Sequence, residues 1–595
     1  MSRRIVLGIS AFYHDSAAAI LRDGEIVAAA QEERFTRIKG DASFPHNAVN
    51  YCLLACKVSI EDVGEIVFYE DPLQKFERLL QSQHWAVPRS LAAFLYAMPK
   101  WLTENLWLEK GIAKELGLRK KRILFRDHHM SHAASAFYPS PFEEAAILTV
   151  DGVGEWSTAA WGMGSGNQIR LRKRMAYPNS LGLLYSAFTF YCGFKINSGE
   201  YKLMGLAPYG KPRFADIIKQ ELVCISDDGS FIMNQNYFSY THGVRTINRK
   251  FTALFGRPAR KPESEITQFD MDIAASIQSV TTEILLKMAR HIREETGCET
   301  LVLAGGVALN VVAMGALQRE AGFARVWVQP AAGDAGGALG AALSVWYEEN
   351  GRPAPQSDGM HGAFLGPAIK KDNKIDDAAL EELGGVWEYL KDSTLAERVA
   401  ALLAQGKIVG VARGRMEWGA RALGNRSIFG NAQNEDTQYI LNVKIKNRES
   451  FRPFGPMVLR EDAQEYFDMQ TDSPYMLFTY PVREERRLPV ESDPAMGIYE
   501  IVKQRRSDIP AVTHVDFSAR VQTVDESNPF ACDVLRALKK RTGCSVMVNT
   551  SFNVRGAPIV NTAQDAFRCF MATGMDYVVI GNRLFDKTRQ RRGDN

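Results

Sequence analysis

The sequence predicts a multi-domain α/β protein, and three observations lead to that prediction. At 595 residues the chain is too long for one ordinary domain, because domains average roughly 150 residues. Hydrophobic residues make up 46% and charged residues 24%, which are globular proportions and exclude a mainly disordered chain. A succession of strand, polar loop, strand, turn and strand occurs twice, about 140 residues apart.

The repeated succession of strands defines the N-terminal half. The first copy is RIVLG at residues 4–8, SAAAIL at 16–21 and IVAAA at 26–30, with Gly24-Glu25 as the turn. The second copy is AAILTV at residues 145–150, STAAW at 157–161 and IRLR at 169–172. A duplicated β-β-β unit followed by helices is the plan of two-lobed sugar kinases and actin-like ATPases, although hairpins occur in any α/β protein.

A domain junction is predicted where the hydrophobic patterning weakens, between residues 351 and 392. Beyond it, a helix at 396–405 and a buried strand at 407–412 open a second domain. The predicted domains are residues 1–360, in lobes of about 1–140 and 141–360, and residues 361–595.

Charge and cysteine content exclude several classes of protein. Lys plus Arg is 72 and Asp plus Glu is 69, and a net charge of +3 does not indicate a nucleic-acid or membrane partner. Eight cysteines without a CxxC pair exclude a disulfide scaffold and a cysteine zinc site, so we expect a cytoplasmic protein. The uncharged stretch 301–317 contains Gly305-Gly306 and Asn310, and we interpret it as buried strand, turn and helix.

A metal site is predicted from a cluster of histidines. His128 and His132 are four residues apart on an expected helix, so both imidazoles project from one face. Asp151 ends a predicted strand and Asp334 precedes a predicted helix, positions where α/β sheets place their sites. Two histidines with carboxylates suit Fe(II), Mn(II) or Zn(II). The alternative is a histidine-rich helix start with ordinary hydrogen bonds.

A glycine pair marks a second candidate loop. Residues 301–310, LVLAGGVALN, predict a strand, a tight turn and a helix start, where backbone amides favour an anion. A structural turn explains the same residues. Neither a Walker A sequence nor a GxGxxG after a strand is present.

Longer motifs carry a resemblance to a known family. They are His14-Asp15-Ser16, QEERFTRIK at residues 31–39, the His128/His132 cluster, VDGVGE at 150–155, GEYKLMGLAPYG at 199–210, GGVALN at 305–310, MEWGARALGNRS at 416–427, RPFG at 452–455, ARVQ at 519–522 and NTSFN at 549–553. Together they resemble the NodU/CmcH-type O-carbamoyltransferases of antibiotic, toxin and nodulation-factor biosynthesis, over nearly the whole chain.

The resemblance implies two active sites. The N-terminal domain is similar to the actin-like (ASKHA) transferase that makes threonylcarbamoyl-adenosine, and the C-terminal domain is similar to YrdC proteins. In such enzymes ATP and carbamoyl phosphate form carbamoyl-adenylate and pyrophosphate in the YrdC-like domain. A hydroxyl of the acceptor then attacks the adenylate in the metal-containing domain. Fe(II) is the implied metal, with Mn or Zn as alternatives, and Mg accompanies ATP.

The resemblance also assigns roles to individual residues. His14 is the expected general base, since its reference pKa lies near neutrality, and Asp15 is its expected orienting partner. The metal ligands are His128, His132, Asp151 and Asp334. The expected cofactor-binding residues are Lys39, Gly154, Gly306, Asn310, Arg421, Lys446, Arg452, Arg520, Asn549 and Ser551.

The C-terminal motifs carry many cations, and their chemistry fits this assignment. Arg415, Arg421, Arg426, Lys446, Arg448, Arg452 and Arg520 lie in short motifs that interleave charge with Gly and apolar residues. Arginine matches phosphate and carbamate oxygens bidentately, so we predict a polyanion site. The alternative is a solvated basic face.

Two other functions compete with a carbamoyltransferase. A sugar or metabolite kinase on the actin-like core would not require the histidine pair or the Arg-rich C-terminal domain. A non-catalytic ATP-binding partner in tRNA modification is disfavoured by the neutral charge balance. We expect a small hydroxylated acceptor and no nucleic-acid or membrane partner, and a homodimer is compatible with the sequence.

Overall fold

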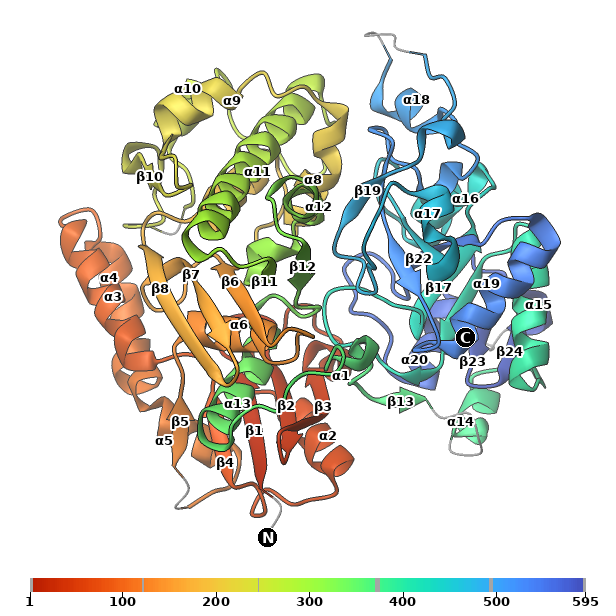
Figure 1. Cartoon of the computed structure of the whole chain (residues 1–595), viewed down its shortest axis with the longest axis horizontal. Coiled ribbons are helices and arrows are strands. Elements are labelled where there is room, and N and C mark those ends of the chain that lie inside the picture. The colour runs from red at the N-terminus through yellow and green to blue at the C-terminus, as the bar shows by residue number, and fades with distance from the viewer. Residues whose placement is uncertain (1–3, 120–121, 244, 370–374, 492–495, 592–595) are drawn as a thin grey trace. The chain divides into compact units, whose positions relative to one another are not determined.

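The structure, a computed structural model, describes residues 4–119, 122–243, 245–369, 375–491 and 496–591 (Figure 1). It contains two compact units: unit 1 is Met1–Glu32 and Ala42–Gly359, and unit 2 is Glu33–Asp41 and Met360–Asn595. The sequence placed residues 33–41 in the N-terminal domain, whereas they belong to unit 2. Residues 370–374 of the predicted junction lie outside the described residues.

Unit 1 contains two five-stranded sheets of the same topology. The first has the spatial order β3 (Glu25–Gln31), β2 (Ala17–Arg22), β1 (Ile5–Ser10), β4 (Glu65–Phe68) and β5 (Ile123–Phe125). The second has the order β8 (Gln168–Ala176), β7 (Ser157–Ser165), β6 (Glu144–Val150), β11 (Thr300–Ala304) and β12 (Arg325–Val328). In each sheet the first three strands of the chain are antiparallel, and the two later strands lie parallel beside the first (Figure 1). The predicted duplication is confirmed, and unit 1 has the actin-like two-lobed fold.

Two helices, one following each sheet's last strand, pack against each other in unit 1. They are α6 (His128–Phe137), which follows β5, and α13 (Asp334–Asn350), which follows β12. Both helices are almost entirely buried. A Cβ atom on Gly340 of α13 would lie 1.8 Å from the carbonyl oxygen of Ser131 in α6, so only glycine permits this packing. The N-terminal residues of α6 and α13 therefore lie close together.

The remaining helices of unit 1 complete the two lobes. They are α2 (His46–Cys56), α3 (Pro72–Trp85), α4 (Leu91–Thr103), α5 (Leu108–Glu115), α7 (Leu181–Tyr191), α8 (Glu200–Leu206), α9 (Ala215–Ile217), α10 (Arg249–Leu254), α11 (Gln268–Thr296) and α12 (Val311–Glu320), with a hairpin of β9 (Val223–Ile225) and β10 (Phe231–Met233). Among the helices of the described residues, none is both long and apolar enough to cross a membrane.

Unit 2 is built on one eight-stranded mixed sheet. Its order is β14 (Trp387–Tyr389), β24 (Arg583–Asp586), β23 (Tyr577–Ile580), β15 (Val409–Ala412), β17 (Arg426–Asn431), β22 (Val546–Ser551), β18 (Gly455–Leu459) and β21 (Gln522–Val524). Short pairs add β13 (Ala368–Ile369) with β16 (Gly414–Arg415), and β19 (Thr479–Pro481) with β20 (Ser518–Arg520). The other helices are α1 (Glu33–Thr36), α14 (Asp377–Glu382), α16 (Asp436–Tyr439), α17 (Ala463–Tyr466), α18 (Ile498–Lys503) and α20 (Ala563–Met571).

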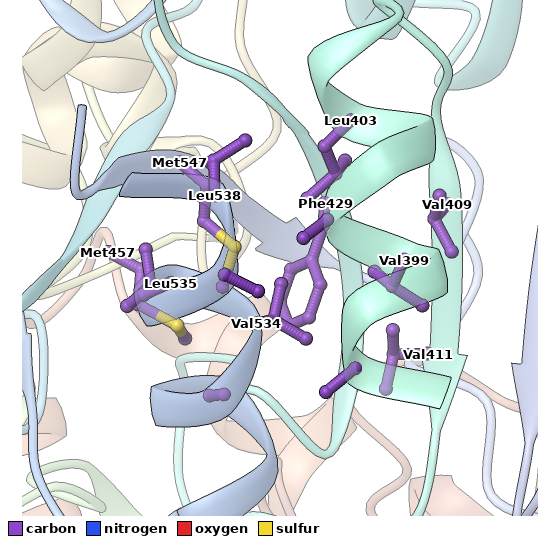
Figure 2. Packing of buried hydrophobic residues seen from close by; sticks show 14 of the residues in the cluster. Val399, Leu403, Val409, Val411, Phe429, Met457, Val534, Leu535, Leu538 and Met547 are labelled. Carbon is purple, nitrogen blue, oxygen red and sulfur yellow. The ribbon is translucent and has the colours of Figure 1, made fainter. Parts of the chain in front are cut away.

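The core of unit 2 lies between this sheet and two helices. Helices α15 (Asp392–Ala404) and α19 (Pro529–Thr542) contribute Val399, Leu403 and Leu535, which pack against Phe429 and Val411 of the sheet (Figure 2). Each such side chain, when fully buried, contributes about 1.5–3 kcal/mol. The helix predicted at residues 396–405 and the strand at 407–412 thus correspond to α15 and β15. The YrdC-like assignment of this unit stays a prediction.

Candidate functional site

Four buried side chains of unit 1 converge on one point. They are His128 and His132 of α6, Asp151 after β6, and Asp334 at the start of α13, and one ligand atom of each lies within 4.8 Å of the others. The two histidine Nε2 atoms are 3.1 Å apart. Asp151 Oδ2 lies 2.8 Å from His128 Nε2 and 3.5 Å from His132 Nε2, and Asp334 Oδ1 lies 3.8 Å from both. The four residues predicted as metal ligands therefore lie together.

The local sequence fixes where these groups project. Asp127 caps α6 by accepting a hydrogen bond from the Met130 amide at 2.8 Å, so the helix begins at His128. His132 follows one turn later and presents its ring on the same face. Because α13 packs closely on α6, its first residue, Asp334, lies beside both rings.

The cluster is chemically suited to a cation. Burial disfavours a charged imidazole, but the Asp151 and Asp334 carboxylates outweigh that cost and raise the pKa of His128 to about 10. The histidine pair in turn holds the pKa of Asp151 well below its usual value against the effect of burial. The buried Nδ1 atoms of both histidines have no hydrogen-bond partner among the described residues. Two imidazoles and two carboxylates are donors that divalent transition metals accept.

Glu155 anchors the cluster, a role that the sequence did not reveal. Its carboxylate accepts hydrogen bonds from the His128 amide at 3.0 Å and from the Asp71 amide at 2.7 Å. It thereby joins the start of α6 to the residue that caps α3. Burial raises the pKa of Glu155 to about 7. Its place in the VDGVGE motif was the available signal, but the partner amides are distant in sequence.

His14 and Asp15 lie at the edge of the metal cluster. His14 Nδ1 is 3.0 Å from Asp15 Oδ2, and His14 Nε2 is 3.7 Å from Asp334 Oδ2. The His14 side chain is 27% exposed, unlike the buried ligand set. Burial opposes its protonation, but Asp334 and Asp15 raise its pKa to about 9. A cation beside Asp334 would offset that charge and move the His14 pKa back towards neutrality.

The glycine loops of unit 1 border the same cluster. The Gly306 amide donates to Asp151 Oδ1 at 2.9 Å, so it orients a predicted metal ligand. The Gly154 carbonyl accepts from Arg78 at 2.6 Å. Asn310 exchanges two hydrogen bonds with Gln278, of 3.0 and 3.1 Å.

A cavity of about 560 Å³ opens beside Gln278 and Val312. It is lined by both apolar groups, such as Met204 and Leu286, and charged ones, such as Lys287. Asn310 therefore lies behind the cavity wall, through its bonds to Gln278, while Gly306 lies at the metal cluster.

In unit 2 the predicted cations form a cluster of like charge. Burial lowers the pKa of Arg421 to about 10. Burial and the guanidinium groups of Arg421, Arg448 and Arg452 together hold the pKa of Arg520 well below its usual value. The Arg520 Nε atom is buried without a hydrogen-bond partner among the described residues. Such an arrangement is stabilised by a bound polyanion, because the anion offsets both the repulsion and the desolvation.

Lys446 and Ser551 lie together beside this cluster. The Lys446 ammonium donates to the Ser551 carbonyl, to Ser551 Oγ at 3.3 Å and to Asn553 Oδ1 at 2.8 Å. Burial, followed by the charges of Arg448, Arg452 and Lys39, holds the Lys446 pKa well below its usual value. Lys39, which the sequence analysis assigns to the N-terminal domain, belongs to unit 2.

Asn549 and two of the arginines have structural partners. The Asn549 amide donates to Gln522 Oε1 at 2.7 Å and to the Ala422 carbonyl at 2.9 Å, so it holds the loop next to Arg421. The Asn549 Oδ1 atom is buried and unpartnered among the described residues. Arg426 donates to several backbone carbonyls, including those of Arg413 and Asn561, and Arg415 donates to those of Leu365 and Gly366. Arg415 and Arg426, which the sequence analysis counts among the anion-binding cations, therefore hold backbone carbonyls in this structure, and their role as anion ligands stays a prediction.

Phosphate binding to unit 2 is expected to take up protons. A bound phosphate offsets the like charges around Lys446 and therefore raises the depressed pKa of this side chain. Between the pKa of the free protein and the higher pKa of the complex, phosphate binding is accompanied by proton uptake. Phosphate affinity consequently falls as pH rises through that range. Calorimetry in two buffers of different ionisation enthalpy measures this uptake. The Lys446→Met variant is expected to abolish it, and equal heats for the wild type in both buffers would contradict the prediction.

Comparison with known proteins identifies the family. Residues 5–343 match the family model "Carbamoyltransferase N-terminus" and residues 400–587 match "Carbamoyltransferase C-terminus". A protein of Synechocystis sp. is 53% identical over 98% of this chain and 97% of its own length. Nodulation protein NolNO of Sinorhizobium fredii is 36% identical over 97% of this chain and 79% of its own. The 3'-hydroxymethylcephem-O-carbamoyltransferase of Amycolatopsis lactamdurans is 27% identical over 77% and 80%, respectively. With both of its units matched, the chain belongs to the carbamoyltransferase family.

Proposed function

We propose that the protein is an ATP-dependent O-carbamoyltransferase that works in two steps at two sites. Unit 2 would form carbamoyl-adenylate from carbamoyl phosphate and ATP, and unit 1 would transfer the carbamoyl group to a hydroxyl of a small molecule. The observation that carries the proposal is the partly buried cluster of like charges formed by Arg421, Arg448, Arg452 and Arg520. Two phosphate-bearing substrates require such a concentration of positive charge.

The chemistry of the first step follows from its atoms. Water releases inorganic phosphate from carbamoyl phosphate and leaves carbamate. A carbamate oxygen then attacks the α-phosphorus of ATP, and pyrophosphate leaves with Mg bound. Arg421, Arg452 and Arg520 hold the anionic oxygens, and Lys446 is fixed for the same task by Ser551 and Asn553. Asn549 sets the loop that carries Arg421.

In the second step the acceptor hydroxyl attacks the carbamoyl carbon, and AMP leaves. His14 takes the hydroxyl proton, and its contact with Asp15 orients the ring. His128, His132, Asp151 and Asp334 would hold the divalent metal, with Fe(II) preferred because two histidines with a carboxylate are typical of non-haem iron sites. Mn(II) and Zn(II) accept the same donors. When bound, the metal supplies Lewis-acid polarisation.

The nucleotide part of the adenylate has a candidate location in unit 1. Gly154 and Gly306 lie beside the metal cluster, where the Gly306 amide orients the Asp151 carboxylate and the Gly154 carbonyl accepts from Arg78. The cavity beside Gln278 has a volume of about 560 Å³, within the range of small-molecule sites. Asn310 positions Gln278 in its wall. A nucleoside is the ligand that we assign to this cavity.

The acceptor is assigned by class only. One relative is named for a hydroxymethylcephem and another for nodulation, which favours a hydroxylated natural product over a nucleic acid. A kinase on the actin-like core would use unit 1 but would leave the cation cluster of unit 2 without a ligand. We therefore retain the carbamoyltransferase as the single proposed function, acting in the cytoplasm without a membrane or nucleic-acid partner.

Mass spectrometry of an acceptor panel tests this function. Hydroxylated candidates are incubated with the protein, ATP, Mg and carbamoyl phosphate, and at least one is expected to gain the mass of one carbamoyl group. The His14→Ala variant is expected to give no carbamoylated product while it still consumes ATP. A mass gain of a phosphoryl group instead would identify a kinase and refute the proposal.

A further inference from the structure

A nine-residue segment of the N-terminal chain is part of unit 2. Residues 33–41 belong to that unit, although the chain on either side belongs to unit 1. Both flanks are fixed in unit 1: the Glu32 carboxylate accepts from the Asn47 and Ala48 amides at 3.1 and 2.8 Å. On the other side the Ala42 carbonyl accepts from the Phe12 amide at 2.9 Å. The residues on both sides of the segment are therefore anchored in unit 1, while the segment itself belongs to unit 2.

The segment has a defined fold of its own. It begins with the single turn α1, and the Glu33 carboxylate closes it by accepting from the Gly40 amide at 2.8 Å. Glu33 also pairs with Arg34 at 3.0 Å, and both side chains are buried. Thr36 donates to Asp41 at 2.6 Å. These bonds link the start of the segment to its end.

Each arginine holds one loop of unit 2. Arg37 donates through Nη1 to the Ile559 carbonyl at 2.5 Å and through Nη2 to the Pro558 carbonyl at 2.8 Å. Arg34 donates through Nη2 to the Gly419 carbonyl at 3.2 Å. A planar guanidinium that binds two successive carbonyls fixes both the position and the direction of that backbone, which a lysine ammonium does not.

One of these loops carries the predicted anion ligand Arg421, and the other contacts Lys446. Gly419 lies two residues before Arg421. On the other loop, Asn553 donates to the Ala557 carbonyl at 2.8 Å, and its Oδ1 atom accepts from the Lys446 ammonium at 2.8 Å. A short path of bonds and backbone thus leads from Arg37, through residues 557–559 and Asn553, to the Lys446 ammonium.

We propose that residues 33–41 support the site in unit 2. Arg37 is a positioning residue: it fixes the loop of residues 551–560, and this loop in turn fixes the position of the Lys446 ammonium. Arg34 sets the Arg421 loop in the same way. This inference rests on the proposed function, because it names these residues as supports of the carbamoyl phosphate and ATP site. It also explains why Lys39 lies in unit 2: the two arginines secure the segment that carries it.

Kinetics of full-length Arg37→Ala and Arg37→Lys test the proposal. Without acceptor, pyrophosphate release by Arg37→Ala is expected to show a KM for carbamoyl phosphate raised roughly tenfold or more, because a small displacement of a binding group costs up to ~10²-fold. Arg37→Lys keeps a donor for one carbonyl and is expected to fall between Arg37→Ala and the wild type. Metal content is expected to stay unchanged.

Lys587→Ala is the matched control in the same unit. Lys587 also donates to backbone carbonyls, those of Met571 at 2.9 Å and Thr573 at 3.1 Å, but these lie at the C-terminal end of α20 and just after it. It is expected to lower the melting temperature about as much as Arg37→Ala while leaving the KM at the wild-type value. If Lys587→Ala raises the KM equally, or if Arg37→Ala leaves it unchanged, the positioning role is refuted.

Calorimetry with inorganic phosphate separates this inference from the proposed function. If the wild type releases no pyrophosphate, the proposed function fails. The phosphate affinities then decide the positioning role alone. A tenfold weaker phosphate affinity in Arg37→Ala than in Lys587→Ala supports it, and equal affinities in the two variants overturn it.

Discussion

The Arg421→Ala variant is expected to lose pyrophosphate release by about 10²–10³-fold, the cost typical of removing one preorganised donor from a developing negative charge. Burial already lowers the pKa of Arg421 to about 10, which means that the fold tolerates its charge at a cost and stabilises it when an anion binds. Release of pyrophosphate in the presence of ATP, Mg and carbamoyl phosphate, without an acceptor, is the measurement.

Arg541→Ala is the control for this substitution. Arg541 belongs to the same unit, and its guanidinium pairs with Glu397 at 2.6 Å where both side chains are about half exposed. A surface pair of this kind contributes little to stability, so the variant is expected to keep the wild-type rate. Wild-type rates in Arg421→Ala, or an equal loss in Arg541→Ala, would remove Arg421 from the site.

The double variant His128→Ala/His132→Ala is expected to lose the bound metal. Both imidazoles leave the cluster, and only the Asp151 and Asp334 carboxylates remain as donors. Metal content by elemental analysis is expected to fall from about one ion per chain to none. Pyrophosphate release in unit 2 is expected to persist, because the cation cluster lies in the other unit.

Two further variants secure this result. His129 lies on the same helix, but its ring bonds to Thr149 Oγ1 at 2.8 Å and to the Ser157 carbonyl at 2.9 Å, so His129→Asn is expected to keep the metal. Asp334→Asn preserves the shape of a ligand and removes its charge, and we expect metal affinity to fall. Unchanged metal content in the double histidine variant would refute the ligand assignment.

Part of this site could be predicted because it depends on local spacing. The separation of His128 and His132 by four residues determines that their rings share a face of a helix. The positions of Asp151 and Asp334 at the ends of elements indicate a sheet edge. Likewise, the repeated strand patterns predicted the duplicated sheets of unit 1, since alternation and turns are short-range signals.

The remaining features depend on contacts between residues far apart in the chain. Arg426 resembles an anion ligand in sequence, but its carbonyl partners lie as far away as Asn561. Glu155 lies in the VDGVGE motif, but its role could not be predicted because neither amide that it binds is near it in sequence. The assignment of residues 33–41 to unit 2 follows from bonds across more than 500 positions, between Arg37 and Pro558. The hydrophobic periodicity of a sequence does not indicate hydrogen bonds between residues so far apart.

Pyrophosphate release without acceptor tests the central claim most directly. The wild-type protein is incubated with ATP and Mg, with carbamoyl phosphate, and with both, and pyrophosphate and AMP derivatives are measured. We expect pyrophosphate only when both substrates are present, together with an adenylate that yields AMP on hydrolysis. Pyrophosphate formed equally well without carbamoyl phosphate, or none formed with both substrates present, would contradict a carbamoyl-adenylate made in unit 2.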